Sequence, residues 1–147
     1  MEEQTSTGSR GRREKKTALD QYAINLTEMA KSNQPFCMEL VTIDTHTPDG
    51  YICDECKHEY DSQYANVISC QSRQVEAFVR WCQKQEWYEN TTIVIIGDHL
   101  SMCSDFFKNK NGNRTQYNLI LNPSPDLKYS KDCLKNRTWS NYDMYPT

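Results

Sequence analysis

"TTIVIIGDHLSM" covers residues 91–102 and joins an apolar run to a polar end. The four consecutive β-branched residues at 93–96 predict a buried strand. That strand stops at Gly97, where a carboxylate, Asp98, and an imidazole, His99, stand side by side. Polar groups directly after a buried strand lie at the rim of its sheet, so Asp98 and His99 are the first candidates for a functional site.

A second apolar run, "PFCMELVTIDTH" at residues 35–46, also predicts a largely buried strand, and it ends on His46. Between the two runs, apolar residues recur every three or four positions over residues 60–82, which predicts a long amphipathic helix. A strand–helix–strand order with such a crossover implies two parallel strands. Their carboxyl ends then share one edge of the sheet, where open α/β sheets bind ligands. We therefore expect His46, Asp98 and His99 to converge on one pocket.

Three further segments complete the predicted order of elements. Helical spacing over residues 19–30 predicts a helix that ends at residues 31–35. Residues 101–113 are rich in turn formers and predict a loop, and residues 117–121 predict a short strand. The predicted fold class is therefore α/β, with a mostly parallel sheet flanked by helices.

Length and composition set the limits of the interpretation. The 147 residues suffice for one domain, with 37% hydrophobic residues, 25% charged residues and a net charge of −3. A general nucleic-acid binder would be basic, so no nucleic-acid partner is expected. No window reaches the roughly 18 apolar residues of a membrane span, and no secretory signal is recognised. Residues 1–18 are polar and predict a disordered lead, which leaves residues 19–147 as the folded part.

Seven cysteines are many for this length, and three interpretations stay open. The spacing of Cys53, Cys56, Cys70 and Cys82 is compatible with a zinc site, with a local disulfide, or with reduced thiols in a loop and a helix. A structural zinc site usually needs a second close pair of ligands, and His58, two residues past Cys56, does not complete one. We expect Cys53 and Cys56 to lie in a surface loop and to have no catalytic role.

Asp98 and His99 could bind a metal ion, because a carboxylate and an imidazole suit Zn²⁺ or Mn²⁺. The alternative is a helix cap beside a surface histidine. The sequence has neither a Gly-rich phosphate loop nor a Gly-x-Ser-x-Gly elbow. Thr45, Thr47 and Ser101 are hydroxyls near the predicted rim, although most such residues only hydrogen-bond within turns.

Three stretches together resemble a known family: "PFCMELVTIDTHTPDGYICDEC", "QYANVISCQSRQVEAFVRWCQKQEWYENTTIVIIGDHLSM" and "YDMYPT". They are similar, in family order and over residues 19–147, to the lipoteichoic acid synthase and phosphoglycerol transferase branch of the sulfatase-like, alkaline phosphatase superfamily. The resemblance implies a mixed α/β sandwich, of which this chain is a partial alkaline-phosphatase-like domain. It also implies a membrane-anchored enzyme whose catalytic domain lies outside the cytoplasm. Such enzymes use a divalent metal and a threonine nucleophile to transfer phosphoglycerol or to cleave a phosphate or sulfate ester.

The family's roles transfer to three residues. By resemblance, Asp98 and His99 are metal ligands for Mn²⁺ or Zn²⁺, and His46 contacts the phosphate of the substrate. The family's nucleophilic threonine and a metal-binding glutamate lie upstream of this region, so no catalytic nucleophile is expected in this chain. The resemblance therefore implies the C-terminal part of a catalytic domain, anchored in a membrane only through an N-terminal region that the chain lacks.

Three functions follow as hypotheses. The first is part of a metal-dependent enzyme acting on an anionic glycerophosphate, phosphate or sulfate ester, inactive as this fragment. The second is a non-catalytic remnant of such an enzyme. The third is an unrelated binding module organised by a zinc ion on Cys53 and Cys56.

Overall fold

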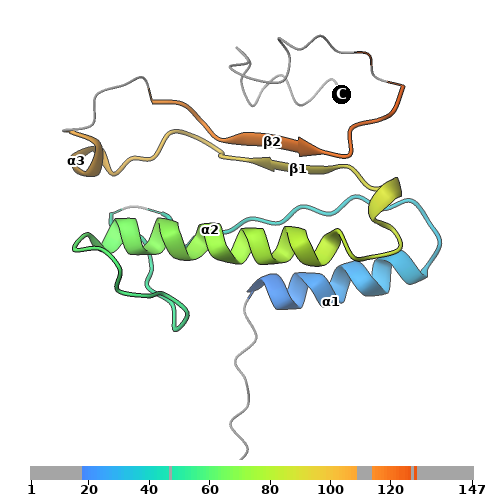
Figure 1. Ribbon diagram of the computed structural model, residues 1–147, viewed down its shortest axis with the longest axis horizontal. Helices are drawn as coiled ribbons and strands as arrows, with labels where there is room; N and C mark the ends of the chain where they lie inside the picture. The colour runs from blue at the N-terminus through green and yellow to red at the C-terminus, as the bar shows by residue number, and fades with distance from the viewer. Residues whose placement is uncertain (1–17, 47, 109–113, 127, 129–147) are drawn as a thin grey trace, which may run out of the picture. The chain divides into compact units, whose positions relative to one another are not determined.

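The computed structural model describes residues 18–46, 48–108, 114–126 and 128. The chain forms two compact units, residues 1–40 and residues 41–147. The first unit contains helix α1 (Ala18–Lys31), which confirms the helix predicted for residues 19–30 (Figure 1). Just past its end, Asn33 has a left-handed backbone (φ 51°), a conformation that commonly ends helices. The predicted lead at residues 1–18 lies outside the described residues except for Ala18, which already belongs to α1.

The second unit contains the long helix α2 (Gln63–Cys82), which confirms the amphipathic pattern at residues 60–82. It begins at Gln63 because the Ser62 hydroxyl caps it by accepting a hydrogen bond from the backbone N–H of Ala65 at 3.3 Å. A short 3₁₀ helix, η1 (Tyr88–Asn90), separates α2 from the sheet. The buried residues of α2 are Tyr64, Asn66, Val67, Cys70 and Cys82.

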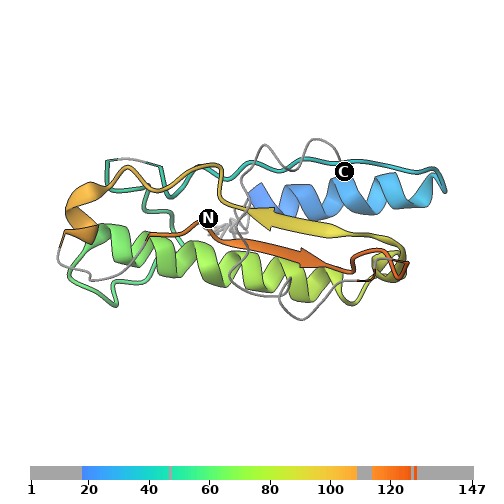
Figure 2. The same cartoon turned by 90° about the horizontal axis from the view of Figure 1, so that it is seen from above.

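Two strands form the sheet, β1 (Ile93–Ile96) and β2 (Asn118–Leu121). Both lie where the sequence predicted strands. They pair antiparallel, with Ile93 opposite Leu121 and Ile96 opposite Asn118. In both views α2 runs alongside the two strands, and β1 points toward the N-terminal end of α2 (Figures 1 and 2). The segment after β1 continues toward the start of α2, where Ser101 Oγ lies 2.6 Å from the Tyr64 hydroxyl.

The predicted parallel pairing is wrong for the residues that the structure describes, because their one sheet is the antiparallel pair. Residues 35–46 form no strand, and Val41 and Ile43 are 67% and 71% exposed. A strand exists only when a neighbouring strand takes up its backbone hydrogen bonds, and within the part of the chain that the structure describes no strand pairs with this run. Instead, the end of this run turns back on itself, with the His46 N–H donating to the Ile43 carbonyl at 3.0 Å.

The loop predicted at residues 101–113 contains a short helix, α3 (Ser104–Phe107), so that part of the prediction is wrong. Its turn is stabilised by ring contacts that sequence spacing does not reveal. The Phe106 ring packs edge-on against the Tyr64 ring, with 5.2 Å between the ring centroids, and against the Phe107 ring, with 5.0 Å between the centroids. Residues 109–113 lie outside the described residues. Among the described helices, none has the length and apolar character required to cross a membrane.

Candidate active-site loops and a cluster of three cysteines

Asp98 and His99 form a close pair directly after β1. The backbone N–H of His99 donates to Asp98 Oδ1 at 2.9 Å, and Asp98 Oδ2 lies 3.5 Å from His99 Nε2. His99 Nδ1 is 2.8 Å from the Leu100 carbonyl. A carbonyl can only accept, so Nδ1 is the donor, and Nε2 is the ring nitrogen that lies near the carboxylate. The carboxylate and His99 Nε2 therefore lie close together, and both side chains are exposed.

His46 lies on a tight turn within the loop at residues 43–51. The Gly50 N–H donates to the His46 carbonyl at 2.9 Å, and the Tyr51 N–H donates to the Asp44 carbonyl at 2.7 Å. Gly50 has φ +71°, and a Cβ there would come within 2.8 Å of both the Asp44 carbonyl and Val67 Cγ1. This turn therefore needs glycine, and it holds the loop against α2.

One hydrogen bond joins the His46 loop and the Asp98–His99 loop directly, and two others attach these loops to the start of α2. The Cys103 thiol donates to the Pro48 carbonyl at 2.7 Å, and the Tyr64 hydroxyl lies 2.6 Å from Ser101 Oγ. Gln63 adds a side-chain donor to the Gly50 carbonyl at 3.2 Å. The two predicted rim segments thus meet at the N-terminal end of α2, although no parallel sheet brings them there.

The structure does not place His46 within ligand distance of the Asp98–His99 pair. Among the described residues, the group of three or more potential metal ligands within 4.8 Å of one another consists of cysteines, and it excludes all three predicted site residues. The convergence of His46 with Asp98 and His99 on one metal or substrate stays a prediction.

The hydroxyl candidates differ in their surroundings. Ser101 Oγ is engaged by Tyr64 and by the backbone N–H of Cys103, which donates to it at 3.2 Å. Burial raises the pKa of Tyr64, while the hydrogen bond to Ser101 acts in the opposite direction. Ser101 therefore stabilises its loop, and Thr45 lies half-buried on the turn. Thr47 lies outside the described residues.

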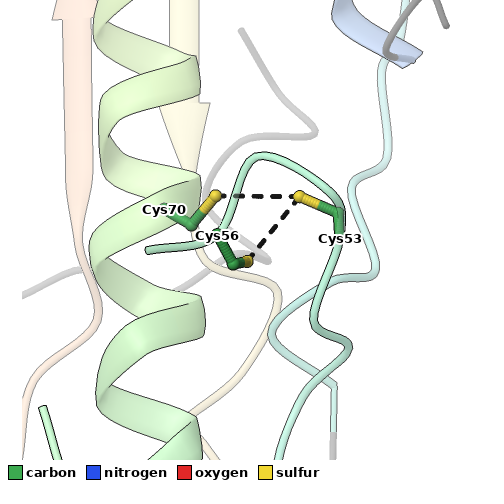
Figure 3. A group of neighbouring side chains, drawn as sticks. All are labelled: Cys53, Cys56 and Cys70. Carbon is green, nitrogen blue, oxygen red and sulfur yellow. Dashed lines mark hydrogen bonds between the residues drawn. The ribbon is translucent and has the colours of Figure 1, made fainter. Parts of the chain in front are cut away.

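A cluster of three cysteines, Cys53, Cys56 and Cys70, bears on the interpretations that the sequence spacing left open. Cys53 Sγ lies 3.6 Å from Cys56 Sγ and 3.7 Å from Cys70 Sγ, and the three sulfurs point toward one another (Figure 3). Cys53 and Cys56 come from the loop before α2, whereas Cys70 comes from α2 itself. The amide nitrogen of Gln74, one helical turn further, lies 3.3 Å from Cys70 Sγ and 3.5 Å from Cys53 Sγ.

The surroundings of this cluster shift the pKa values of Cys53 and Cys56 in opposite directions. Burial raises the pKa of Cys56 to about 12, together with its hydrogen bonds to Cys70 and Cys53. Burial also acts to raise the pKa of Cys53, but hydrogen bonds from the Glu55 backbone, the two other thiols and Gln74 outweigh it and lower that pKa. Cys53 is therefore the thiol that this arrangement favours as a thiolate.

The chain belongs to the sulfatase family, whose model, described as "Sulfatase", matches residues 2–143. Within that family it falls in the phosphoglycerol transferase branch. It is 31% identical over 117 residues to phosphoglycerol transferase I of Escherichia coli (strain 55989 / EAEC), an alignment that covers 74% of this chain and 15% of the relative. The corresponding enzyme of Shigella flexneri is 30% identical over 120 residues, covering 76% of the chain and 16% of that protein.

The chain thus spans about 15% of the length of the curated relatives that it matches. Phosphoglycerol transferase I of Citrobacter koseri gives the same result, at 32% identity over 98 residues, 63% of the chain and 13% of that protein. No solved structure matches the chain. Family membership implies an α/β fold of the alkaline-phosphatase type, to which the described helices and strands contribute.

Proposed function

We propose that this chain forms part of a metal-dependent enzyme that transfers phosphoglycerol or hydrolyses a phosphate or sulfate ester. The observation that carries the proposal is the Asp98–His99 pair, placed directly after β1 in a chain of the sulfatase family. The two loops that meet at the start of α2 would form one wall of the active site. One of these loops carries Asp98 and His99, and the other carries His46.

The donor chemistry of the pair fits a divalent cation. Asp98 Oδ2 and His99 Nε2 are 3.5 Å apart, and because Nδ1 is engaged by the Leu100 carbonyl, Nε2 is the ring nitrogen that would bind the ion. Such outer hydrogen bonds orient metal-binding histidines. Mn²⁺ and Zn²⁺ both accept oxygen and imidazole ligands. When bound, such an ion would polarise the ester oxygen of the substrate and activate a nucleophile.

The role of His46 would be electrostatic. Its exposed imidazole is carried by a turn that the Gly50 and Tyr51 hydrogen bonds hold in shape. A donating or cationic imidazole at that position would stabilise the negative charge that develops on a transferred phosphoryl or sulfuryl group. An anionic glycerophosphate, phosphate ester or sulfate ester is therefore the proposed substrate class. By analogy with the family, the complete enzyme would act at the outer face of a cell membrane.

Residues 1–147 alone should be inactive. Two protein ligands leave most of the coordination shell of a metal to water, whereas catalytic zinc sites usually supply three. In addition, Ser101 Oγ is engaged by Tyr64 and by the Cys103 N–H, so it is not placed as a nucleophile. Without a covalent nucleophile, the two-step route through an enzyme intermediate is closed.

The proposal is tested by locating Mn²⁺ on the purified chain. Bound Mn²⁺ broadens the amide resonances of nearby residues, so substoichiometric Mn²⁺ should first broaden those of residues 97–100. The change Asp98→Asn should abolish this effect. The matched control is Asp105→Asn on α3, since that carboxylate is also exposed and pairs with Lys108 instead.

One outcome would contradict the metal site, and another would contradict the expected inactivity of the isolated chain. Broadening that is spread over the chain, or that persists unchanged in Asp98→Asn, would show that Asp98 and His99 do not bind the metal. In a parallel assay with a chromogenic phosphodiester and Mn²⁺ or Zn²⁺, we expect no turnover above background. Turnover that disappears in Asp98→Asn would show that the chain already carries a complete site.

A further inference from the structure

Three cysteine sulfurs come together at the middle of α2, although they are separated by up to 17 positions in the sequence. Cys53 and Cys56 lie on a turn closed by the Cys56 N–H, which donates to the Cys53 carbonyl at 3.0 Å. Cys70 is buried on the face of α2 that this turn covers. The cluster is therefore built from a local Cys-x-x-Cys turn and one helical residue, a combination that is common in metal sites.

The sulfur positions match those of thiolates around one tetrahedral ion. A Zn–S bond of about 2.3 Å and a tetrahedral angle place two coordinating sulfurs about 3.8 Å apart. The measured separations are 3.6 Å between Cys53 and Cys56 and 3.7 Å between Cys53 and Cys70. All three sulfurs also lie within 4.8 Å of one another, so a single ion can contact each of them. A disulfide would use only two of the three and leave the third without a role.

We propose that Cys53, Cys56 and Cys70 bind one zinc ion, at a site separate from the Asp98–His99 pair. Thiolate sulfur favours zinc over the harder cations that suit carboxylates. The three protein ligands leave a fourth position for a ligand from solvent. The chemistry involves no electron transfer: each thiol that binds releases a proton, and the ion replaces it.

The surroundings of the cluster support the charge of bound thiolates. The Gln74 amide nitrogen lies within reach of two of the sulfurs, and it would donate hydrogen bonds to them when they are deprotonated. Such outer donors are a regular part of cysteine metal sites. The same loop is fixed a few residues later by Asn66, whose Oδ1 accepts from the Glu59 and Tyr60 N–H groups at 2.8 and 2.9 Å. The turn is therefore held in place on both sides of the proposed site.

The bound ion would stabilise the loop, and the site would differ from most structural zinc sites in having three protein ligands in place of four. By joining the turn at residues 53–56 to α2, the ion would close the loop that begins at the His46 turn and ends at Ser62. Because a metal that binds only the folded chain adds its binding free energy to stability, zinc should stabilise this loop. This role does not depend on the proposed ester chemistry, since none of its ligands belongs to the Asp98–His99 pair.

The experiment measures metal content and cobalt spectra of the purified, reduced chain. We expect about one zinc per chain by mass spectrometry, and a thiolate-to-cobalt charge-transfer band when Co²⁺ is added to the metal-free chain. Cys53→Ser and Cys70→Ser should each lower zinc affinity at least about tenfold, since each removes one ligand. Cys37→Ser is the matched control, because Cys37 is exposed and lies outside the cluster. Asp98→Asn should keep its zinc, which separates this result from a failure of the proposed function.

Three results would overturn the zinc site. The first is the absence of stoichiometric zinc and of the cobalt band in the unmodified chain, which does not depend on whether any variant folds. The second is zinc retained at full affinity by Cys53→Ser and Cys70→Ser. The third is a disulfide between two of the cluster cysteines in the chain as isolated, together with no uptake of zinc after that disulfide has been reduced and the fold verified by circular dichroism.

Discussion

The Cys103 thiol donates a hydrogen bond to the Pro48 carbonyl across 2.7 Å, and it thereby joins two loops that are 55 positions apart in the sequence. One loop carries His46, and the other carries Asp98 and His99. Cys103 is 8% exposed whereas Pro48 is exposed, so the bond is partly buried. A single thiol therefore helps to set the distance between the two halves of the proposed active site.

Removing that thiol should loosen the contact between the loops. We expect Cys103→Ala to lower the free energy of unfolding by about 1 kcal/mol, since it removes the hydrogen bond to the Pro48 carbonyl. Cys103→Ser retains a donor and should lose less. Urea unfolding at neutral pH measures both, with the exposed Cys37→Ala as the control that should change little. Equal losses for the alanine and serine variants would mean that the hydrogen bond contributes nothing.

The contact between Tyr64 and Ser101 makes a second, independent test. Tyr64→Phe removes the hydroxyl that lies 2.6 Å from Ser101 Oγ, but it keeps the ring that meets Phe106 at 5.2 Å. We expect a loss of about 1 kcal/mol for this change and a similar loss for Ser101→Ala. The double variant should lose less than the sum, because both changes break the same bond. Strict additivity in the unfolding free energies would contradict the contact.

The elements that sequence periodicity could reveal are local ones. Helix α2 follows from apolar residues three or four apart, and β1 follows from a run of β-branched residues. Pairing between strands is not local. The run at residues 35–46 has the composition of a strand, but it forms one only if a partner supplies backbone hydrogen bonds, and Val41 and Ile43 lie exposed instead. The antiparallel register of β1 with β2 could not be predicted for the same reason.

The candidate sites show the same division between local and distant information. Asp98 and His99 are neighbours in sequence, and their pairing at 3.5 Å follows from that adjacency. The cysteine cluster joins a local pair to Cys70, and the spacing of Cys70 alone could not say which face of α2 it occupies. Only the path of the loop over the helix brings its sulfur to 3.7 Å from Cys53. Sequence spacing suggested zinc without supplying the third ligand's position.

Gly50 and Gly97 make a matched pair for a test of the His46 turn. Gly50→Ala should lower the free energy of unfolding by about 2–3 kcal/mol, because its backbone has φ +71° and the new Cβ would meet Asp44 and Val67 at 2.8 Å. Gly97→Ala should change it by less than about 0.5 kcal/mol, since its nearest neighbour would be the His99 carbonyl at 3.9 Å. Thermal or urea unfolding of the two variants measures the difference. Similar losses in both would show that the turn at Gly50 does not need its left-handed conformation.

Cys82 gives the chain a stability that depends on pH in the alkaline range. This thiol is 1% exposed, and burial raises its pKa from 9.0 to about 11. Below about pH 9 the thiol is protonated in both the folded and the unfolded chain, so it adds no pH dependence. Between about pH 9 and 11 the unfolded chain loses this proton while the folded chain keeps it, so the free energy of unfolding falls as the pH rises.

We expect Cys82 to account for a fall of up to about 2–3 kcal/mol over that range. Urea unfolding at about pH 8 and about pH 10.5 measures it, and the Cys82→Ala variant supplies the comparison. Alanine should lower the free energy of unfolding at pH 8 by about 1–2 kcal/mol, because it leaves a small cavity. The free energy of unfolding of this variant should, however, fall less between the two pH values. Other groups that titrate in this range contribute equally to both chains and cancel in the difference. If the two chains lose the same free energy between the two pH values, Cys82 is not held protonated by burial.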